Sequence, residues 1–306
     1  MTPEIIPFGA AEPLLSWEAL ARALAAGHSL PRAGIGDTFL YRDPDTLLSR
    51  SAWIDGMGIA VKTATIFPGN PARDLPSVNG GVSLFSDADG TLEAIVDFHL
   101  VTKWKTAGDS LLAAKRLARP DSETILIVGA GTVAHSLYEA YSSAFPQARF
   151  QVWNRSSEGA ARMASAFPDV TPVHDLEEAV RGADIVTSAT MSTQPLIRGE
   201  WLRPGQHIDL IGAYRPDMRE ADDAALARAR VFVDSRETTL DHIGELKIPL
   251  ENGVMSREDV VADYYDLPSG RFARQGEDEI TLFKNGGGAH LDLMTSRYIL
   301  GAWRAR

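Results

Sequence analysis

The feature that most restricts the fold of this 306-residue chain is a series of short apolar runs that alternate with helical segments. The series starts with "TILIVGAG" (124–131), an apolar strand that ends in glycines. Strands that alternate with short helices are typical of α/β proteins with a doubly wound parallel sheet, and we expect that fold here. The expected helices cover 132–144, 157–167, 175–181 and 217–228, and the other expected strands are 149–153, "VTPV", "DIVTSAT", "HIDLIGA" and "RVFVDS".

The first 118 residues follow a different pattern. A helix is expected over 14–27, with Ser16 as its N-cap and Gly27 at its end. The runs "TFLYR", "GIAVKTATIF", "GVSLFSD" and "LEAIVDF" are separated by Pro, Gly, Asn and Asp clusters, which indicates antiparallel strands and turns. A helix over 101–118 then ends at "ARPDSE", and we interpret this break as a domain boundary.

The C-terminal segment "ITLFKNGGGAHLDLMTSRYILGAW" contains a strand, a glycine loop and a helix. We expect the helix to return to the first domain. The predicted organisation is therefore an N-terminal α+β domain of residues 1–118, completed by about 288–306, and a doubly wound domain of residues 119–287.

Composition excludes several functional classes. Acidic residues outnumber Lys plus Arg by 41 to 30, a formal charge of −11, which argues against a nucleic acid as the main partner. The absence of cysteine excludes disulfides and thiolate metal sites, and the seven histidines lack metal-ligand spacing, so no metal is expected. No apolar run approaches the ~20 residues of a membrane span, and "MTPEIIPFG" does not resemble a signal peptide. We expect a cytoplasmic protein with no membrane partner.

The loop "GAGTVA" carries the clearest functional signal. Gly129 permits a tight turn after the strand, Gly131 lets the backbone approach a pyrophosphate, and Ala134 lets the helix pack closely on the strand. The N-terminus of the following helix faces the anion, with Thr132 and Val133 completing the loop. This context predicts a Rossmann-type dinucleotide site, whereas the alternative is a tight strand–helix turn without a ligand.

The strand "FQVW" ends in "NRSS", where NAD-binding proteins usually have an acid that binds the ribose 2′-hydroxyl. Asn154 removes that charge, Arg155 adds a cation and Ser156 adds a hydroxyl. These residues favour NADP(H), with NAD(H) as the alternative, because an arginine at this strand end accepts the 2′-phosphate. The segment could also be a polar turn with Ser156 as the N-cap of the next helix.

Ligands of doubly wound sheets bind at the carboxyl edge, where the strand order reverses. The loops after "DIVTSAT" and "HIDLIGA" belong to that edge. Thr190, Gly212, Ala213 and Tyr214 are therefore candidates for the nicotinamide side, although ordinary loop packing explains each of them equally well.

Two lysines and one histidine are candidates for chemistry. Lys62 lies in the apolar strand "GIAVKTATIF", and a buried lysine usually meets a carboxylate or has a lowered pKa. Lys105, in "TKWKTAGDS", is expected at a helix start, where a cation opposes the helix dipole unless an anion is near; taken alone, it is better explained as a solvated side chain. His290 follows the "NGGG" loop and is better explained as a satisfied or exposed histidine than as a catalytic one.

Together these segments resemble the ornithine cyclodeaminase/mu-crystallin family. The similarity covers most of the chain and rests on blocks in the family's order, among them "VKTATIFPGN", "LVTKWKTAGDSLLAAKRLA", "ILIVGAGTVA", "IGAYRPDMRE" and "LFKNGGGAHLD". The resemblance implies a Rossmann domain plus a substrate-binding and dimerisation domain, and hence a homodimer. It also implies that Arg32, Lys62 and Lys105 bind a substrate carboxylate, with Arg42 as a competitor for Arg32, and that Ser77 contacts substrate or nicotinamide.

Two positions depart from the family pattern. Lys105 replaces an arginine, which loses the planar fork that binds a carboxylate with two hydrogen bonds. Tyr214 stands where ornithine cyclodeaminase has an acid, and a tyrosine phenol is a poor base at neutral pH.

These observations lead to one main functional hypothesis and two alternatives. The expected activity is an NAD(P)-dependent oxidoreductase that acts on the C–N bond of a small amino acid or a cyclic imino acid. The alternatives are ornithine cyclodeaminase proper, which converts ornithine to proline and ammonia, and a non-catalytic protein that binds NADP(H) or a small ligand.

Overall fold

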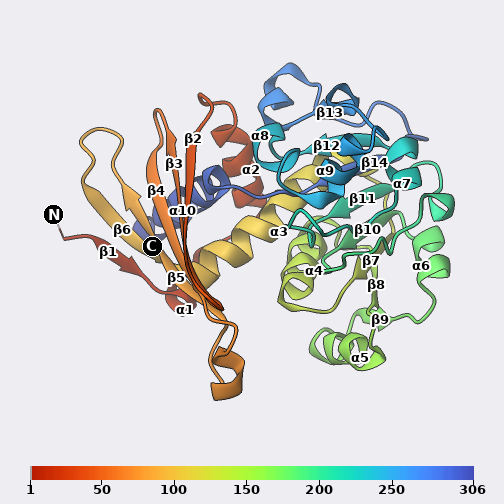
Figure 1. The fold of residues 1–306 in the computed structure, drawn as a ribbon, viewed down its shortest axis with the longest axis horizontal. Helices are drawn as coiled ribbons and strands as arrows, with labels where there is room; N and C mark the ends of the chain where they lie inside the picture. Colours follow the sequence, from red (N-terminus) through yellow and green to blue (C-terminus); the bar gives the residue numbers. More distant parts are fainter. Residues whose placement is uncertain (1) are drawn as a thin grey trace. The chain divides into compact units, whose positions relative to one another are not determined.

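The computed structural model describes residues 2–306, which divide into two compact units (Figure 1). The first unit contains the chain up to Lys105 together with Gly288–Arg306, and the second is Thr106–Gly287. The division lies within helix α3 (Phe98–Leu117), whereas the sequence break at "ARPDSE" follows that helix.

The first unit is built on a six-stranded sheet with the order β1-β6-β5-β4-β3-β2. Its strands pair antiparallel except β1, which lies parallel to β6. β1 and β3 were not anticipated, because β1 has only three residues and β3 is a run of mostly small and polar residues. The strands are β1 (Glu4–Ile6), β2 (Gly34–Arg42), β3 (Asp45–Ile54), β4 (Gly58–Ile66), β5 (Val78–Phe85) and β6 (Leu92–Asp97).

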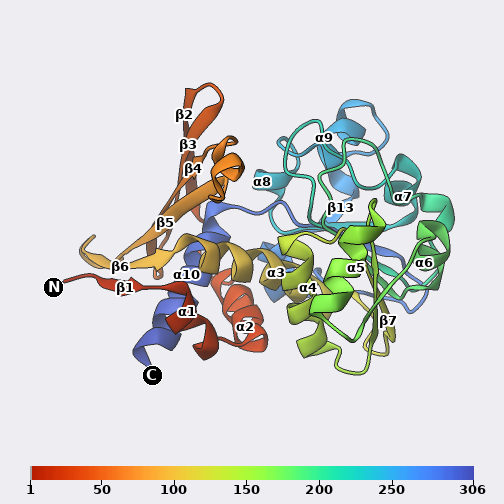
Figure 2. The same cartoon turned by 90° about the horizontal axis from the view of Figure 1, so that it is seen from below.

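Helices of the first unit cover one face of this sheet. The C-terminal helix α10 (Ala289–Arg304) packs on β3, β4 and β5, and α2 (Trp17–Gly27) lies beside it (Figure 2). Ser16 caps α2 as expected, since its hydroxyl accepts the N–H of Ala19 at 3.4 Å. Shorter elements are α1 (Phe8–Ala11) and the 3-10 turns η1 (Glu12–Leu14) and η2 (Asn70–Arg73).

The second unit contains an eight-stranded, entirely parallel sheet with the order β13-β12-β14-β11-β10-β7-β8-β9. The predicted doubly wound α/β fold is thereby confirmed. After β9 the chain returns to the other side of β7, so the strand order reverses between β7 and β10. The strands are β7 (Thr124–Val128), β8 (Arg149–Trp153), β9 (Val170–Pro172), β10 (Ile185–Ser188), β11 (His207–Leu210), β12 (Arg230–Val233), β13 (Val260–Ala262) and β14 (Thr281–Lys284).

The helices of this unit pack on apolar strands. Leu126, Val186 and Ile208 form a core cluster with residues of α6, α7 and α9, such as Val180 and Leu246. The helices are α4 (Thr132–Ala144), α5 (Ser157–Ala166), α6 (Leu176–Gly182), α7 (Asp223–Arg228), α8 (Arg236–Thr239) and α9 (Gly244–Glu251), with 3-10 turns η3 (Gly199–Trp201), η4 (Arg257–Asp259) and η5 (Tyr264–Ser269).

One expected helix was wrong in its first half. The helix predicted over 217–228 exists only as α7, from Asp223. The preceding residues run beside another loop, where Ile197 and Ala221 form an isolated parallel bridge. Within residues 2–306, no helix is both long enough and apolar enough to cross a membrane.

Candidate active site

Lys62 is the centre of the candidate active site in the first unit. It lies in β4 on the face that α10 covers, and its side chain is buried, with 8% exposure. Its ammonium donates hydrogen bonds to Thr102 Oγ1 at 3.0 Å and to Asp292 Oδ1 at 2.9 Å. The ammonium also lies over the ring of Phe98, 4.7 Å from the centroid. Lys62 is thus buried, as its apolar strand predicts, and it meets a carboxylate, which is one of the two outcomes expected for a buried lysine.

Asp292 supplies that carboxylate from the first turn of α10, where a negative charge is favoured by the helix dipole. Burial alone would raise the pKa of Asp292, but the charges of Lys62, Lys105 and Arg50 outweigh burial and hold the pKa below its usual value. Its second oxygen, Oδ2, is buried and has no hydrogen-bond partner within residues 2–306. The site therefore keeps one carboxylate oxygen available to a donor.

Arg50 adds a second cation on the same face of the sheet. It stands directly opposite Lys62 in the β3–β4 register. Asp37 holds its guanidinium with two hydrogen bonds, Nε to Oδ1 at 3.3 Å and Nη2 to Oδ2 at 2.7 Å. Lys105 is a third, half-buried cation whose charge reaches both Lys62 and Asp292. The three cations, with Lys62 included, outnumber the two acids, Asp292 and Asp37. The site therefore has a net positive charge, which suits an anionic ligand.

This arrangement changes the pKa of Lys62. Burial lowers the pKa of Lys62 most strongly, and the like charges of Lys105 and Arg50 lower it further. Asp292 opposes this effect, but the net pKa stays below the ordinary lysine value. A lysine in this state is a better proton donor than a solvated one.

His290 is fully buried and lies edge-to-face with His28, with ring centroids 5.5 Å apart. His28 Nδ1 lies 2.7 Å from the carbonyl of Leu24. Burial, followed by the charges of His28, Lys105, Arg50 and Arg32, holds the pKa of His290 well below the usual histidine value. His290 is therefore neutral and does not add to the positive charge of the site.

The other residues that the sequence singled out in the first unit lie at different places. Arg32 is exposed, between α2 and β2, and its charge acts on His290. Arg42 pairs with Asp45 at 2.6 Å beside the β2–β3 turn. Ser77 is half-buried, immediately before β5. Lys105 does not lie at a helix start, because α3 begins at Phe98, so the expected conflict with the helix dipole does not arise there.

The glycine loop of the second unit has the geometry that a dinucleotide requires. Gly129 has φ of +105°, and a Cβ there would meet the carbonyl oxygen of Ala189 at 2.9 Å. Gly131 is the N-cap of α4, and the space where its Cβ would point is open. The first turn of α4 has no acidic residue that would repel a phosphate. These features fit a bound pyrophosphate.

The end of β8 lies against this loop, since Gly129 N donates to the carbonyl of Trp153 at 2.8 Å. Asn154 Nδ2 donates to the carbonyl and hydroxyl oxygens of Ser156, at 3.0 and 3.2 Å. The Ser156 hydroxyl also accepts Gly159 N at 3.3 Å and caps α5, while Arg155 is exposed. The capping interpretation of "NRSS" is therefore correct, and the exposed Arg155 leaves the phosphate interpretation intact.

The two remaining loops of the carboxyl edge follow β10 and β11. Thr190 follows β10, and Gly212 and Ala213 follow β11, the adjacent strand. Tyr214 is 59% exposed, and the guanidinium of Arg215 lies 5.9 Å from its ring. Across residues 2–306, no group of three His, Cys, Asp or Glu side chains is placed to hold a metal ion.

Sequence reasoning missed Arg50 and Asp292. Arg50 lies in the unanticipated strand β3, and no local signal distinguishes it from a surface arginine. Asp292 had a signal, because "AHLDLMT" places one acid in an otherwise apolar helical turn. A buried acid of this kind is seldom found without a cationic partner.

Comparison with known proteins places these features in context. A sequence model described as the ornithine cyclodeaminase/mu-crystallin family matches residues 53–306. A Δ1-pyrroline-2-carboxylate reductase of Paracoccus denitrificans is 54% identical over 304 residues, covering 97% of this chain and 96% of the relative. The structure of Thermococcus litoralis Δ1-pyrroline-2-carboxylate reductase with NADH and L-proline is 25% identical and superposes with a TM-score of 0.89, covering 99% of this chain and 98% of the other. An archaeal alanine dehydrogenase dimer with bound NAD is 27% identical, with a TM-score of 0.90 over 100% and 97% of the two chains.

A double-mutant cycle tests the buried ion pair. Lys62→Met leaves the buried Asp292 without the cation it binds, and Asp292→Leu leaves the buried Lys62 without the acid it binds. We expect each single variant to lose about 3 kcal/mol in the free energy of unfolding. Asp292→Leu is expected to be the worse variant, because Lys62 then faces only the like charges of Lys105 and Arg50. The double variant should lose much less than the sum of the two single losses, as measured by urea unfolding. Additive losses would show that the two side chains do not interact.

Proposed function

Because the chain belongs to the ornithine cyclodeaminase/mu-crystallin family, we propose that it is an NAD(P)H-dependent reductase of a cyclic imino acid, with Δ1-pyrroline-2-carboxylate as the first candidate substrate. The Paracoccus relative, at 54% identity over nearly the full length, supports this substrate. The observation that carries the proposal is the Lys62–Asp292 pair beside Arg50 and Lys105, a net cationic site with a buried proton donor.

The reaction requires a hydride at the imine carbon and a proton at the imine nitrogen. NAD(P)H supplies the hydride when it is bound, and the chain supplies orientation and the proton. Lys62 donates the proton from Nζ, since its lowered pKa makes that transfer easier than from a solvated lysine. Asp292 stabilises the charged form of Lys62 until the transfer.

The substrate carboxylate is bound by the cations around Lys62. Arg50 offers a planar guanidinium that Asp37 holds in place, and Lys105 offers a point charge. Arg50 thus supplies from the sheet the fork that was missing at Lys105. Arg32 is a further candidate, since its charge reaches His290 on the same face. Ser77 remains a candidate from the family resemblance alone, and Tyr214 remains one from its place in the loop after β11.

The glycine loop with Gly129, Gly131 and the start of α4 is the proposed pyrophosphate site, and Thr190, Gly212 and Ala213 are proposed for the nicotinamide side. The cytoplasmic location expected from the sequence is part of this proposal.

Oxidation of NADPH and NADH in the presence of Δ1-pyrroline-2-carboxylate tests the function directly. We expect steady turnover by the wild-type protein and a loss of about 10²-fold or more in Lys62→Ala, as for a lost general acid. Cofactor affinity should barely change, because Lys62 is assigned to the substrate. Lys247→Ala, on α9, is the matched control and should turn over normally.

Three results would contradict this assignment. Cofactor binding without turnover on any cyclic imine would favour a binding protein. Turnover confined to ornithine, with ammonia release, would favour a cyclodeaminase. Near-normal turnover of Lys62→Ala would remove Lys62 from the mechanism.

We also propose that the cofactor is NADP(H) rather than NAD(H), since no acid stands at the end of β8 and Arg155 is free to reach a 2′-phosphate. A hydrogen bond to a charged group contributes roughly 1.5–3 kcal/mol, so Arg155→Ala should weaken NADPH binding about 10- to 150-fold. NADH binding should stay nearly unchanged in calorimetry, and the exposed Arg162→Ala is the control. Equal affinities of the wild-type protein for NADH and NADPH would contradict the proposal.

We propose in addition that the protein is a homodimer formed through the face of the six-stranded sheet opposite α10. Trp53 and Ile95 are 53% and 37% exposed on that face, and Ile59 and Val61 are only half-buried. The archaeal alanine dehydrogenase, which is a dimer, has the same fold. Sedimentation should give twice the chain mass of 33.2 kDa, and Ile95→Lys should shift the protein toward monomer. A wild-type monomer at micromolar concentration would contradict this.

A further inference from the structure

Glu220 is a fully buried carboxylate at the carboxyl edge of the parallel sheet, and it binds two separate loops. Its Oε1 accepts the hydroxyl of Ser188 at 2.6 Å, the N–H of Thr190 at 2.7 Å and the hydroxyl of Thr190 at 2.9 Å. Its Oε2 accepts the N–H groups of Gly212 at 2.6 Å and Ala213 at 3.2 Å. One side chain therefore joins the ends of the adjacent strands β10 and β11.

The loops that Glu220 joins are packed without spare room. A Cβ at Gly212 would lie 1.9 Å from the carbonyl oxygen of Thr190 and 2.3 Å from its nitrogen. A Cβ at Gly129, in the glycine loop after β7, would meet Ala189 O at 2.9 Å and the methyl group of Thr190 at 3.4 Å. Residues 189–190 thus lie between the glycine loop and the loop after β11. A shift of Thr190 would disturb both neighbours.

The backbone of Glu220 is fixed by a second buried acid. Its backbone N–H donates to Oε2 of Glu245, another fully buried acid, at 2.7 Å. Lys284 supplies the counter-charge, and its buried ammonium donates to the carbonyls of Leu210 and Asn285, both at 2.8 Å. Glu220 therefore accepts five hydrogen bonds and lies near a buried cation. Glu220, Glu245 and Lys284, which hold these two loops, are all fully buried, so the arrangement does not depend on flexible surface groups.

We propose that Glu220 is a positioning residue of the cofactor site, which fixes the loops after β10 and β11 in the conformation that receives the nicotinamide half of NAD(P)H. The inference rests on the proposed cofactor site, but it does not depend on the identity of the substrate. Glu220 contacts only the backbone and hydroxyl groups of the loops, so it acts through them. The adenosine half is assigned to the end of β8, which Glu220 does not contact.

Replacement of Glu220 by glutamine tests whether this residue supports binding of the nicotinamide half of the cofactor and not of the adenosine half. Glu220→Gln keeps the size of the side chain but turns one acceptor oxygen into an amide that must face N–H or O–H donors. Binding is measured by calorimetry for NAD(P)H, using whichever nucleotide the wild-type protein binds more tightly. The second probe is the matching adenosine fragment, adenosine 2′,5′-bisphosphate for NADPH or AMP for NADH. Neither probe requires turnover, so a failed reductase assay leaves the test intact.

We expect a selective loss of affinity for the whole cofactor. Glu220→Gln should weaken NAD(P)H binding by about 10- to 100-fold, the range for lost hydrogen bonds to a charged group. Binding of the adenosine fragment should change by no more than about 2-fold, because its site lies at the end of β8. If Glu220→Gln does not fold, Ser188→Ala removes one hydroxyl donor and should weaken only NAD(P)H, by about 2- to 10-fold.

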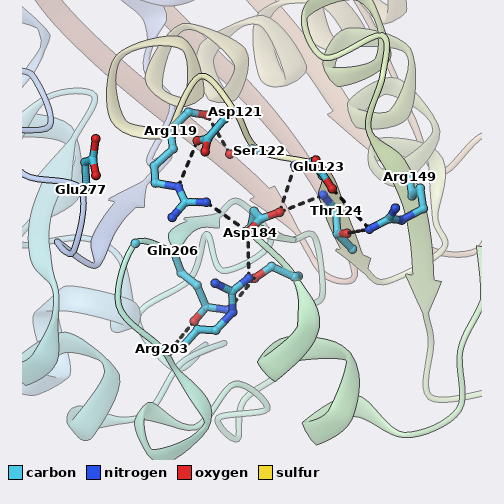
Figure 3. A network of polar contacts seen from close by, with 12 residues as sticks. Arg119, Asp121, Ser122, Glu123, Thr124, Arg149, Asp184, Arg203, Gln206 and Glu277 are labelled. Carbon is cyan, nitrogen blue, oxygen red and sulfur yellow. Dashed lines mark hydrogen bonds and ion pairs between the residues drawn. The ribbon is translucent and has the colours of Figure 1, made fainter.

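Asp184 offers a matched control at the opposite edge of the same sheet. It precedes β10, accepts the backbone N–H groups of Glu123 at 2.9 Å and Thr124 at 3.0 Å, and pairs with Arg203 at 2.8 Å (Figure 3). Asp184→Asn also removes a charge from an acid that holds backbone groups. We expect it to lower the thermal midpoint without changing the ratio of the two affinities.

Two outcomes would overturn the proposal. One is a folded Glu220→Gln or Ser188→Ala variant that binds NAD(P)H as tightly as the wild-type protein. The other is equal weakening of NAD(P)H and the fragment, or the same selective loss in Asp184→Asn, since either would indicate general damage to the fold.

Discussion

Lys62 is a cation placed inside the packed face of a sheet, and the rest of the candidate site depends on how its charge is balanced. Asp292 meets it at 2.9 Å from the first turn of α10, so the C-terminal helix is needed for a site whose lysine lies in the N-terminal strands. A buried ion pair is seldom a strong stabiliser, because desolvation offsets most of the attraction. Its retention is better explained by chemistry, since Arg50 and Lys105 keep the site net positive and lower the pKa of Lys62.

The second unit uses buried acids for a different purpose. Glu220 binds the loops after β10 and β11, and Asp234 accepts the N–H groups of Gly286 at 3.1 Å and Gly287 at 2.5 Å after β14. Loops at a carboxyl edge have no strand partners for these N–H groups, so carboxylates satisfy them. Burial raises the pKa of Glu245 to about 7, with the charge of Glu220 adding to the effect. A cofactor site on such fixed loops requires little rearrangement on binding.

The sequence was most informative where local pattern and tertiary structure agree. The bounds of α4 and β8 match their expected ranges, because an amphipathic helix and a strand that buries alternate apolar residues leave few alternatives. The helix expected over 217–228 was half wrong, because Glu220 bonds to distant loops and draws its segment out of helical geometry. Lys62 could be identified as a charge in an apolar strand. Asp292 could not be paired with it, since 230 residues separate them and only the fold brings them together.

Asp292 keeps Lys62 charged inside a site that otherwise lowers the pKa of this lysine. Nuclear magnetic resonance titration of a selectively labelled Lys62 side chain measures that pKa directly in the wild-type protein and in Asp292→Asn. We expect a wild-type pKa below the ordinary lysine value of 10.5 and a further decrease in the variant, because the attractive charge of Asp292 is removed. A wild-type pKa at the ordinary value, or a pKa that does not fall in Asp292→Asn, would show that Asp292 does not hold the charge of Lys62 in this way.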